Sequence, residues 1–237
     1  ADFSGEVNTD ELLNFYRFED LHELTGRINA DVSLQGRIAL LKNKSTAQQV
    51  RTEGNIELHN LNFRIGENQH AFTGINGALQ FNNNDLAMSN LKGSFENSDF
   101  VLNGFFKNVV TFLLFPNQPI GVEADLKSEF LDIDQLFSIG FGSQDQGPYQ
   151  FSISPNLHLN FTYNINQLRF RRFHPTRVKG DLLVKGQVAV ARAIHLSGMG
   201  GTVDLSGIID AKNAKAIDLI ASSKLKGIQI DSLFYVF

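Results

Sequence analysis

The chain has 237 residues, of which 42% are hydrophobic and 19% charged, and its formal net charge at pH 7 is −4. This balance provides enough apolar residues for a folded core and excludes a general electrostatic attraction to nucleic acid or acidic membranes. The chain has no cysteine, which excludes disulfides, thiolate chemistry and cysteine-based metal sites. It has 21 Phe, 4 Tyr and no Trp. Because the phenylalanine ring has no polar atom, these side chains are expected to lie in fully apolar surroundings.

Alternating apolar and polar residues predict strands along most of the first half. The segment GNIELHNLNFRI (54–65) alternates with a one-residue slip after Leu58, which predicts a bulge or bend, and GINGALQF (74–81) alternates without a slip. Helical periodicity is scarce, and its signals predict short helices in ELLNFYRF (11–18) and DQLFSIGF (134–141). Many strands at regular spacing indicate an all-β chain.

The second half holds the longest alternating segment, FSISPNLHLNFTYNI (151–165). Its odd positions are apolar or proline and its even positions are small or polar, which predicts one strand with an apolar and a polar face. At full extension these 15 residues span roughly 50 Å, whereas common strands have about 5–6 residues. VKGDLLVKGQVAV (178–190) alternates as well. The most apolar run, VVTFLLF (109–115), is too short for a membrane-spanning helix.

Internal repeats organise these strands. Three segments share one pattern, in which a strand of alternating polarity ends at an aspartate that is followed by any residue, a leucine and a hydrophobic residue. The segments are SGEVNTDELLNF (4–15), SEFLDIDQLFSI (128–139) and LKGIQIDSLFYV (225–236). The aligned Asp10, Asp134 and Asp231 are predicted to cap short helical turns, because an aspartate oxygen accepts hydrogen bonds from the free N–H groups of a first turn. The hydrophobic residues after each cap would then fold back onto the sheet.

A second repeat is marked by glycine spacing. Gly77 and Gly104 are 27 residues apart, as are Gly180 and Gly207, and each interval predicts a three-strand meander. Further strands and a capped turn complete the unit. The expected organisation is the end of a preceding repeat with connecting strands (1–50), a first β repeat (51–139), a loop (140–150) and a second β repeat (151–237) in one continuous domain.

The meander glycines and the strand endings FLDIDQLF and GIQIDSLF resemble the AsmA-like family of Gram-negative envelope proteins. The likeness is one of pattern and covers most of the chain. It implies a long, twisted, open β-sheet curled into a groove, a location in the periplasm, and a role in outer-membrane assembly or phospholipid movement between membranes. It also implies attachment to the inner membrane through an anchor helix that this sequence lacks, so we expect a piece excised from a longer protein.

The fold expected from the residues is a long antiparallel sheet with repeats, curled into an open groove or packed as a sandwich, with short Asp-capped helical turns. Burying a Leu, Ile or Phe side chain contributes about 1.5–3 kcal/mol. Burying seven large side chains of one strand face against an apolar partner would therefore contribute on the order of 10–20 kcal/mol. Lipid acyl chains are one such partner. The expected groove residues are Phe151, Ile153, Leu157, Leu159, Phe161, Tyr163, Ile165, Leu79 and Phe81.

One basic patch, RFRRFHPTRVK (169–179), is interleaved with aromatic residues. Its simpler interpretation is the solvated end of a strand with a turn at His174-Pro175. Its functional interpretation is a site where Arg169, Arg171 and Arg172 bind phosphate groups. A lipid headgroup is favoured over nucleic acid as the source of the phosphate, because the chain is acidic overall.

Other candidate sites have simpler interpretations. Asp132 and Asp134 alternate on one strand face, which suits acid–base or metal chemistry, but a solvent-facing aspartate followed by a helix cap is favoured. The 6 His have no metal-ligand spacing, and SGMGGT (197–202) lacks the residues of a phosphate loop. We therefore expect no catalytic residue, cofactor or metal.

Three hypotheses remain after these exclusions. The first is a non-enzymatic envelope protein whose groove binds or conducts lipid acyl chains. The second is an adhesin-like structural or protein-interaction module whose apolar face is a closed core. The third, a carbohydrate-active enzyme, is disfavoured because sugar stacking commonly uses Trp or Tyr, and the chain has no Trp and only 4 Tyr.

Overall fold

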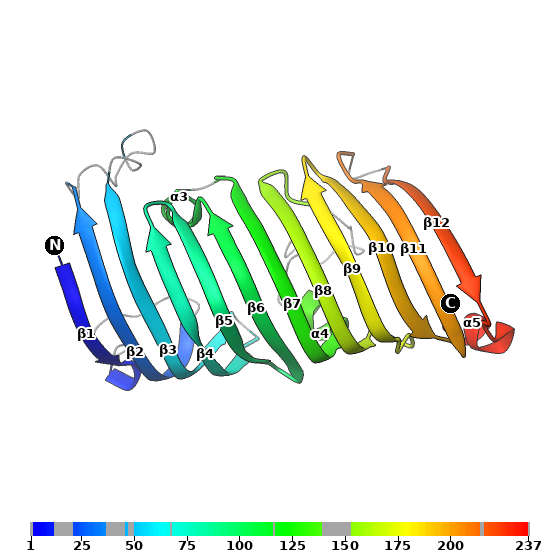
Figure 1. Cartoon of the computed structure of the whole chain (residues 1–237), viewed down its shortest axis with the longest axis horizontal. Coiled ribbons are helices and arrows are strands. Elements are labelled where there is room, and N and C mark those ends of the chain that lie inside the picture. Colours follow the sequence, from blue (N-terminus) through cyan, green and yellow to red (C-terminus); the bar gives the residue numbers. More distant parts are fainter. Residues whose placement is uncertain are drawn as a thin grey trace. The chain divides into compact units, whose positions relative to one another are not determined.

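The protein is all-β and forms a mostly antiparallel sheet. The structure is a computed structural model that describes residues 2–11, 21–36, 46, 50–66, 68–115, 117–138, 153–213 and 216–236. Its 12 strands are ordered in the sheet as they are in the sequence, from β1 to β12, and the sheet does not close (Figure 1). Each strand pair with a described register is antiparallel. The expected fold class is therefore confirmed.

Contacts divide the chain into two compact units. Unit 1 comprises residues 1–96 and 100–123, and unit 2 comprises residues 97–99 and 124–237. Unit 1 holds β1 (Asp2–Asn8), η1 (Thr9–Glu11), β2 (Leu21–Gln35), β3 (Arg51–Ile65), β4 (His70–Asn82), β5 (Asp85–Phe95), most of β6 (Ser98–Lys107), α3 (Val109–Leu114) and the start of β7 (Ile120–Asp132). Unit 2 holds the rest of β7, α4 (Ile133–Ser138), β8 (Leu157–Arg169), β9 (Thr176–Lys185), β10 (Val188–Gly198), β11 (Gly201–Asp210), β12 (Asp218–Lys226) and α5 (Ile230–Val236).

The order of elements repeats as the sequence predicts. β1 is followed by η1, β7 by α4 and β12 by α5, so each predicted strand ending leads into a helical turn. The glycine-marked meanders correspond to β4–β6 and β9–β11. The predicted helix at 134–141 begins one residue earlier, at Ile133. Residues 12–18 of the other predicted helix and the loop at 140–150 lie outside the described residues, and the repeat limits remain predictions.

The long strand expected at 151–165 is shorter at its start and longer at its end. β8 runs from Leu157 to Arg169, and a turn precedes it, in which the Leu157 N–H donates to the Ser154 carbonyl at 3.2 Å. The expectation was wrong here because Pro155 has no N–H to donate to a sheet ladder and fixes its own φ, which suits a turn. Alternation of polarity does not detect that effect.

A line of bulges bends the strands of unit 1. The register shifts between Leu58 and Leu61, which confirms the predicted slip, and Asn60 has a φ of 50°. Asparagine side chains satisfy the backbone groups that the bulges leave unpaired: Asn76 Oδ1 accepts from the Asn60 N–H at 3.0 Å, and Asn62 Oδ1 accepts from the Gly74 N–H at 2.8 Å. Such bulges increase local twist, which helps the sheet to curl.

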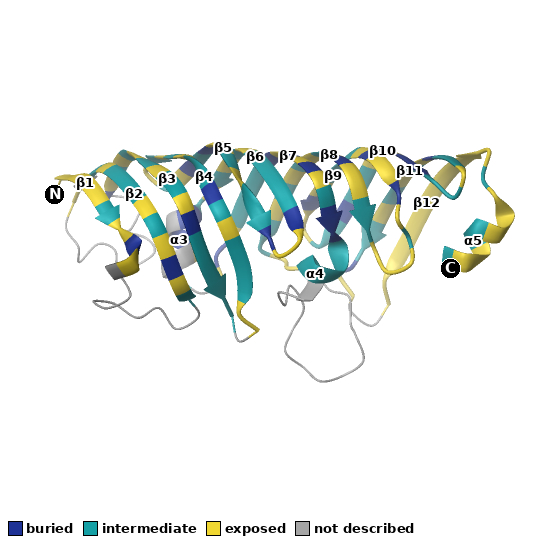
Figure 2. Cartoon of the chain, turned by 90° about the horizontal axis from the view of Figure 1, so that it is seen from below, coloured by how far each residue is buried: buried dark blue, intermediate teal, exposed yellow. Residues whose placement is uncertain are grey.

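Within each unit the sheet is curled (Figure 2), and burial alternates along parts of its strands, as in the first half of β3 and in β8. All 12 described strands belong to this one sheet, so the described chain contains no second sheet to pack on the first as in a sandwich. Among the described helices, none is both long and apolar enough to cross a membrane.

Candidate functional site

The register of β8 and β9 brings large apolar side chains together on one face of unit 2. Leu159 pairs with Val184, Phe161 with Leu182, and Ile165 with Val178. The register of β10 and β11 continues this face with Ala189 opposite Ile209 and Leu196 opposite Val203. We call it the apolar face of unit 2; its members are Leu157, Leu159, Phe161, Tyr163, Ile165, Val178, Leu182, Val184, Ala189, Leu196, Val203, Leu205, Ile209, Leu219 and Leu225.

One end of this face is sealed. Ile153, Val184, Ala189 and Ala211 form a buried cluster, against which Leu157, Leu159, Leu182 and Ile209 pack. The predicted groove residue Ile153 is thus part of a closed core, because the turn before β8 folds it onto the sheet. Phe151, another predicted groove residue, lies outside the described residues.

The apolar face becomes exposed at its edge strand, β12, whereas Val178, Leu196 and Val203, at the end away from the sealed cluster, are buried. Phe161 and Tyr163 are half-buried, Ile165 is buried, and every residue of β12 is exposed. Leu219 of β12 retains 66% of its surface. The face therefore passes from a sealed core to a single layer of apolar side chains with partial access to solvent.

Tyr163 has a polar atom within this apolar face. It pairs with Gly180, where an added Cβ would lie 2.7 Å from the phenolic oxygen, so the ring occupies the space above the glycine. Burial raises the pKa of the Tyr163 phenol, and the negative charge of Asp181 raises it further. The phenol therefore keeps its proton to a higher pH than an ordinary tyrosine.

Unit 1 has an apolar face of its own, which includes the predicted groove residues Leu79 and Phe81. Leu79 pairs with Ile56 and Met88, and Phe81 pairs with Leu86. Leu79 and Phe81 are half-buried, whereas Met88 and Leu86 are buried. The predicted groove residues are therefore divided between two units, and each unit presents its own apolar face.

The predicted headgroup arginines have specific contacts within unit 2. The Arg169 guanidinium pairs with the Asp132 carboxylate, so it is already neutralised. Arg171 and Arg172 have exposed side chains that lie over the rings of Phe170 and Tyr235, at 5.5 and 5.7 Å from the ring centroids. The turn expected at His174-Pro175 lies instead at Phe170–Phe173, whose backbone N–H and carbonyl groups bond reciprocally. Of the three arginines, Arg171 and Arg172 remain candidates for an anionic ligand.

For two of the three predicted helix caps, Asp10 and Asp134, the capping side chain lies two residues earlier. Asp132, not Asp134, caps α4, because its Oδ1 accepts from the N–H groups of Asp134 at 3.1 Å and Gln135 at 3.4 Å. Asp132 is fully buried, so the solvent-facing placement expected from the sequence was wrong. In the same way the Asn8 side chain accepts from the Asp10 N–H at the start of η1, at 3.4 Å. Asp231 lies in the first turn of α5.

The aspartates of the repeat tie their turns to the next strand or hairpin. Asp10 Oδ1 accepts from the Gly26 N–H at 3.3 Å, and Asp134 Oδ2 accepts from the Arg171 N–H at 2.7 Å. The repeated x-Leu pattern thus marks a real structural unit. The sequence did not reveal which polar residue is the cap, because the segment offers two acceptor side chains, two positions apart, and either could cap the helical turn.

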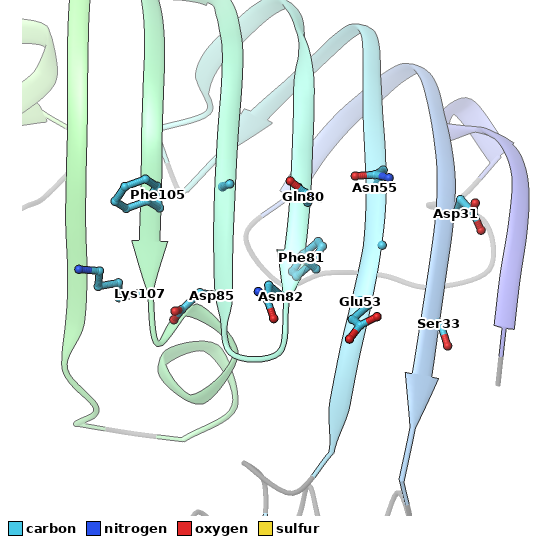
Figure 3. A pocket seen from close by; sticks show the side chains of 12 residues that line it. Asp31, Ser33, Glu53, Asn55, Gln80, Phe81, Asn82, Asp85, Phe105 and Lys107 are labelled. Carbon is cyan, nitrogen blue, oxygen red and sulfur yellow. The ribbon is translucent and has the colours of Figure 1, made fainter.

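A polar pocket of about 660 Å³ lies on the other face of unit 1, and sequence analysis did not identify it. Strand register aligns Asp31, Asn55 and Gln80 in one row across β2, β3 and β4. A second row contains Ser33, Glu53, Asn82 and Asp85, and Phe105 and Lys107 of β6 also line the pocket (Figure 3). The sequence signal for this pocket is a set of polar residues at alternate positions of neighbouring strands. Only the strand register shows that these residues lie side by side.

No metal site is formed by three or more His, Asp or Glu side chains within the described ranges. Comparison with family models, with characterised proteins and with solved structures gave no match for this chain. The resemblance to AsmA-like proteins therefore stays a prediction, and function has to be inferred from the geometry of the two faces.

Proposed function

We propose that the chain is a non-enzymatic, lipid-binding part of a bacterial envelope protein, in which the apolar sheet face accommodates acyl chains. The carrying observation is a row of large apolar side chains on a single-layered sheet, sealed at one end and exposed at the edge strand β12. Acyl chains need apolar contact and no directional polar group, so such a face suits them without a catalytic site.

The pattern resemblance to AsmA-like proteins supports a periplasmic location and a role in outer-membrane assembly or phospholipid transport. In this proposal an anchor outside the present chain attaches the protein to the inner membrane. Arg171 and Arg172 would contact the phosphate of a phospholipid headgroup, because both guanidinium groups are exposed and stack on aromatic rings without a carboxylate partner among the described residues.

A test is native mass spectrometry of the protein purified from bacterial membranes, followed by lipid extraction. We expect co-purifying phospholipid and uptake of a fluorescent fatty acid. Phe161→Asp should reduce both at least tenfold, because it puts a charge among Leu182 and Tyr163. Asn164→Asp is the matched control, since Asn164 is exposed on the polar face of the same strand, opposite Lys179.

Circular dichroism and a denaturant titration must show that both variants fold. A folded protein that carries no phospholipid and takes up no fatty acid would overturn the proposal. Equal lipid binding by wild type and by folded Phe161→Asp would also do so, because the apolar face would then not be the site.

The alternative, a protein-interaction module, is favoured by a different observation. Leu183, Val190, Ile208 and Ile220 form a row across β9–β12 on the face opposite to Leu182 and Val184. Leu183, Ile208 and Ile220 are exposed, and lipid in the apolar face would leave them uncovered. If the protein is lipid-free, Ile208→Ser should disrupt its association with a protein partner while leaving the fold intact.

A further inference from the structure

The polar pocket of unit 1 has the chemistry of a binding site separate from the apolar face. Its two rows lie on adjacent strands, so neighbouring polar side chains are about 5 Å apart across strands and roughly 7 Å apart along them. Its volume of about 660 Å³ falls within the range of about 300–1,000 Å³ usual for small-molecule sites. A rigid sheet thus holds a regular array of polar groups around a hollow.

Much of this array is available to a ligand. Asp31, Glu53, Asn55 and Gln80 are exposed, and their side chains have no hydrogen-bond partner among the described residues. The neighbouring groups serve the protein itself, since Asp85 Oδ1 accepts from the Asn108 N–H at 2.9 Å and Asn82 Oδ1 accepts from the Asn83 amide at 3.1 Å. The pocket therefore combines fixed structural groups at one end with free acceptors beside them.

The charges of the pocket select against anions. Asp31, Glu53 and Asp85 contribute three carboxylates, while the one lining lysine, Lys107, pairs with Glu123. A phosphate or a nucleic acid would be repelled by this arrangement. A ligand that fits must present several hydrogen-bond donors without negative charge.

Phe105 adds an apolar platform at the side of the array. Its ring keeps 43% of its surface exposed, and the Lys107 ammonium lies 5.8 Å from the ring centroid. In Figure 3 the ring lies at one side of the polar side chains that line the pocket, next to Lys107. A saccharide ring has both features that such a surface recognises: a C–H face that packs on an aromatic ring and hydroxyl groups that donate to carboxylate and amide oxygens.

We propose that the polar pocket binds a saccharide without negative charge. Phe105 of β6 packs on the C–H face of one sugar ring, and Gln80 of β4, Asn55 and Glu53 of β3 and Asp31 of β2 accept hydrogen bonds from the hydroxyl groups of further rings of the same oligosaccharide. The site needs no catalytic group and does not depend on lipid binding in unit 2, because its polar side chains lie in unit 1, on the other face of the sheet from Leu79. Phe81, from the same face as Leu79, also contributes to the pocket lining.

Isothermal titration calorimetry and saturation-transfer NMR with maltotetraose, cellotetraose, chitotetraose and its deacetylated form would test this site. We expect binding of at least one of these probes. Phe105→Ala and Asn55→Ala should each weaken that binding at least tenfold. Phe112→Ala is the matched control, because Phe112 in α3 has nearly the same exposure, 42% against 43%, and does not line the pocket.

Three results would overturn the inference. The first is the absence of binding by all four probes at millimolar concentration. The second is binding that Phe105→Ala and Asn55→Ala leave unchanged. The third is binding lost on addition of EDTA and restored by Ca²⁺, which would mean that the carboxylates hold a cation instead of contacting sugar hydroxyls directly. A Phe161→Asp variant that loses lipid but keeps saccharide binding would separate this inference from the proposed lipid function.

Discussion

The buried carboxylate of Asp132 joins the start of α4 to the end of β8, because one oxygen caps the helix and the other pairs with Arg169. The Asp132 side chain is 0% exposed, whereas the Arg169 side chain remains 43% exposed. This pair links two elements 37 residues apart in the sequence. It also shows why the basic patch is only partly free for ligands.

Asp132→Ala should lower the free energy of unfolding by about 2–4 kcal/mol, because it removes a helix cap and leaves Arg169 without its carboxylate. Urea denaturation measures this difference. Lys127→Ala is the control, since Lys127 is exposed on the same strand, and it should change stability by less than about 0.5 kcal/mol. A stability equal to that of wild type would contradict the assigned role of the pair.

The burial of the Tyr163 phenol leads to a second prediction, which concerns how stability depends on pH. The folded state raises its pKa above the usual 10.0, so the folded protein keeps this proton where the unfolded chain loses it. The stabilising contribution is complete below the unfolded-state pKa and is lost as the pH rises through the folded-state value. Tyr163→Phe should therefore show a smaller loss of stability above pH 10 than wild type.

Ultraviolet difference titration of wild type against Tyr163→Phe measures the same group directly. The phenolate absorbance missing from the variant should titrate above pH 10.0, the usual value for tyrosine. The other 3 of the 4 tyrosines are common to both proteins and cancel. Titration of the missing absorbance at or below the usual value would show that Tyr163 is not buried by its neighbours.

Gly26 is required where β2 crosses the bulge of β3. Its φ is +113°, and an added Cβ would lie 2.5 Å from the Asn60 carbonyl oxygen. Gly26→Ala should cost about 2–4 kcal/mol, since it adds a backbone clash to an unfavourable conformation. Gly66→Ala separates the two effects, because Gly66 has a φ of +72° but nothing within 4 Å of its Cβ position; it should cost about 1 kcal/mol. Thermal unfolding compares the variants, and equal losses would exclude the clash.

The sequence predicts much of this fold because its signals are local. Period-two alternation identifies strands, and the slip after Leu58 locates a bulge that the register places between Leu58 and Leu61. Wherever two neighbouring signals competed, prediction was less accurate. Pro155 stopped a strand that alternation extended, and Asp132 took the capping role expected of Asp134.

The candidate sites depend on long-range register, which a single sequence does not contain. Asp31, Asn55 and Gln80 are separated by 24 or more residues yet lie in one row, because β2, β3 and β4 pair in a particular register. The partner of Arg169 is likewise 37 residues away. The part of the apolar face on β8 was accessible to prediction because its members alternate along that strand, whereas the polar pocket required five strands, β2 to β6, to be aligned.

The asparagines at the bulges of unit 1 allow the contribution of single hydrogen bonds to be tested. Asn76 Oδ1 accepts from the Asn60 N–H at 3.0 Å, and Asn76 Nδ2 donates to the Gly74 carbonyl at 2.7 Å. Asn76→Leu removes both bonds and should lower the free energy of unfolding by about 1–3 kcal/mol, because backbone groups at the bulge lose their partners. Asn76→Asp keeps the acceptor for Asn60 and should cost less.

Hydrogen exchange of the Asn60 amide measures the first of these bonds directly. Its protection should fall at least tenfold in Asn76→Leu and remain near the wild-type value in Asn76→Asp, since only the former removes the acceptor. If both variants exchange alike, the two bonds do not act separately. If Asn60 stays protected in both, water or another side chain satisfies its N–H, and the bend of the strands follows from sheet twist alone.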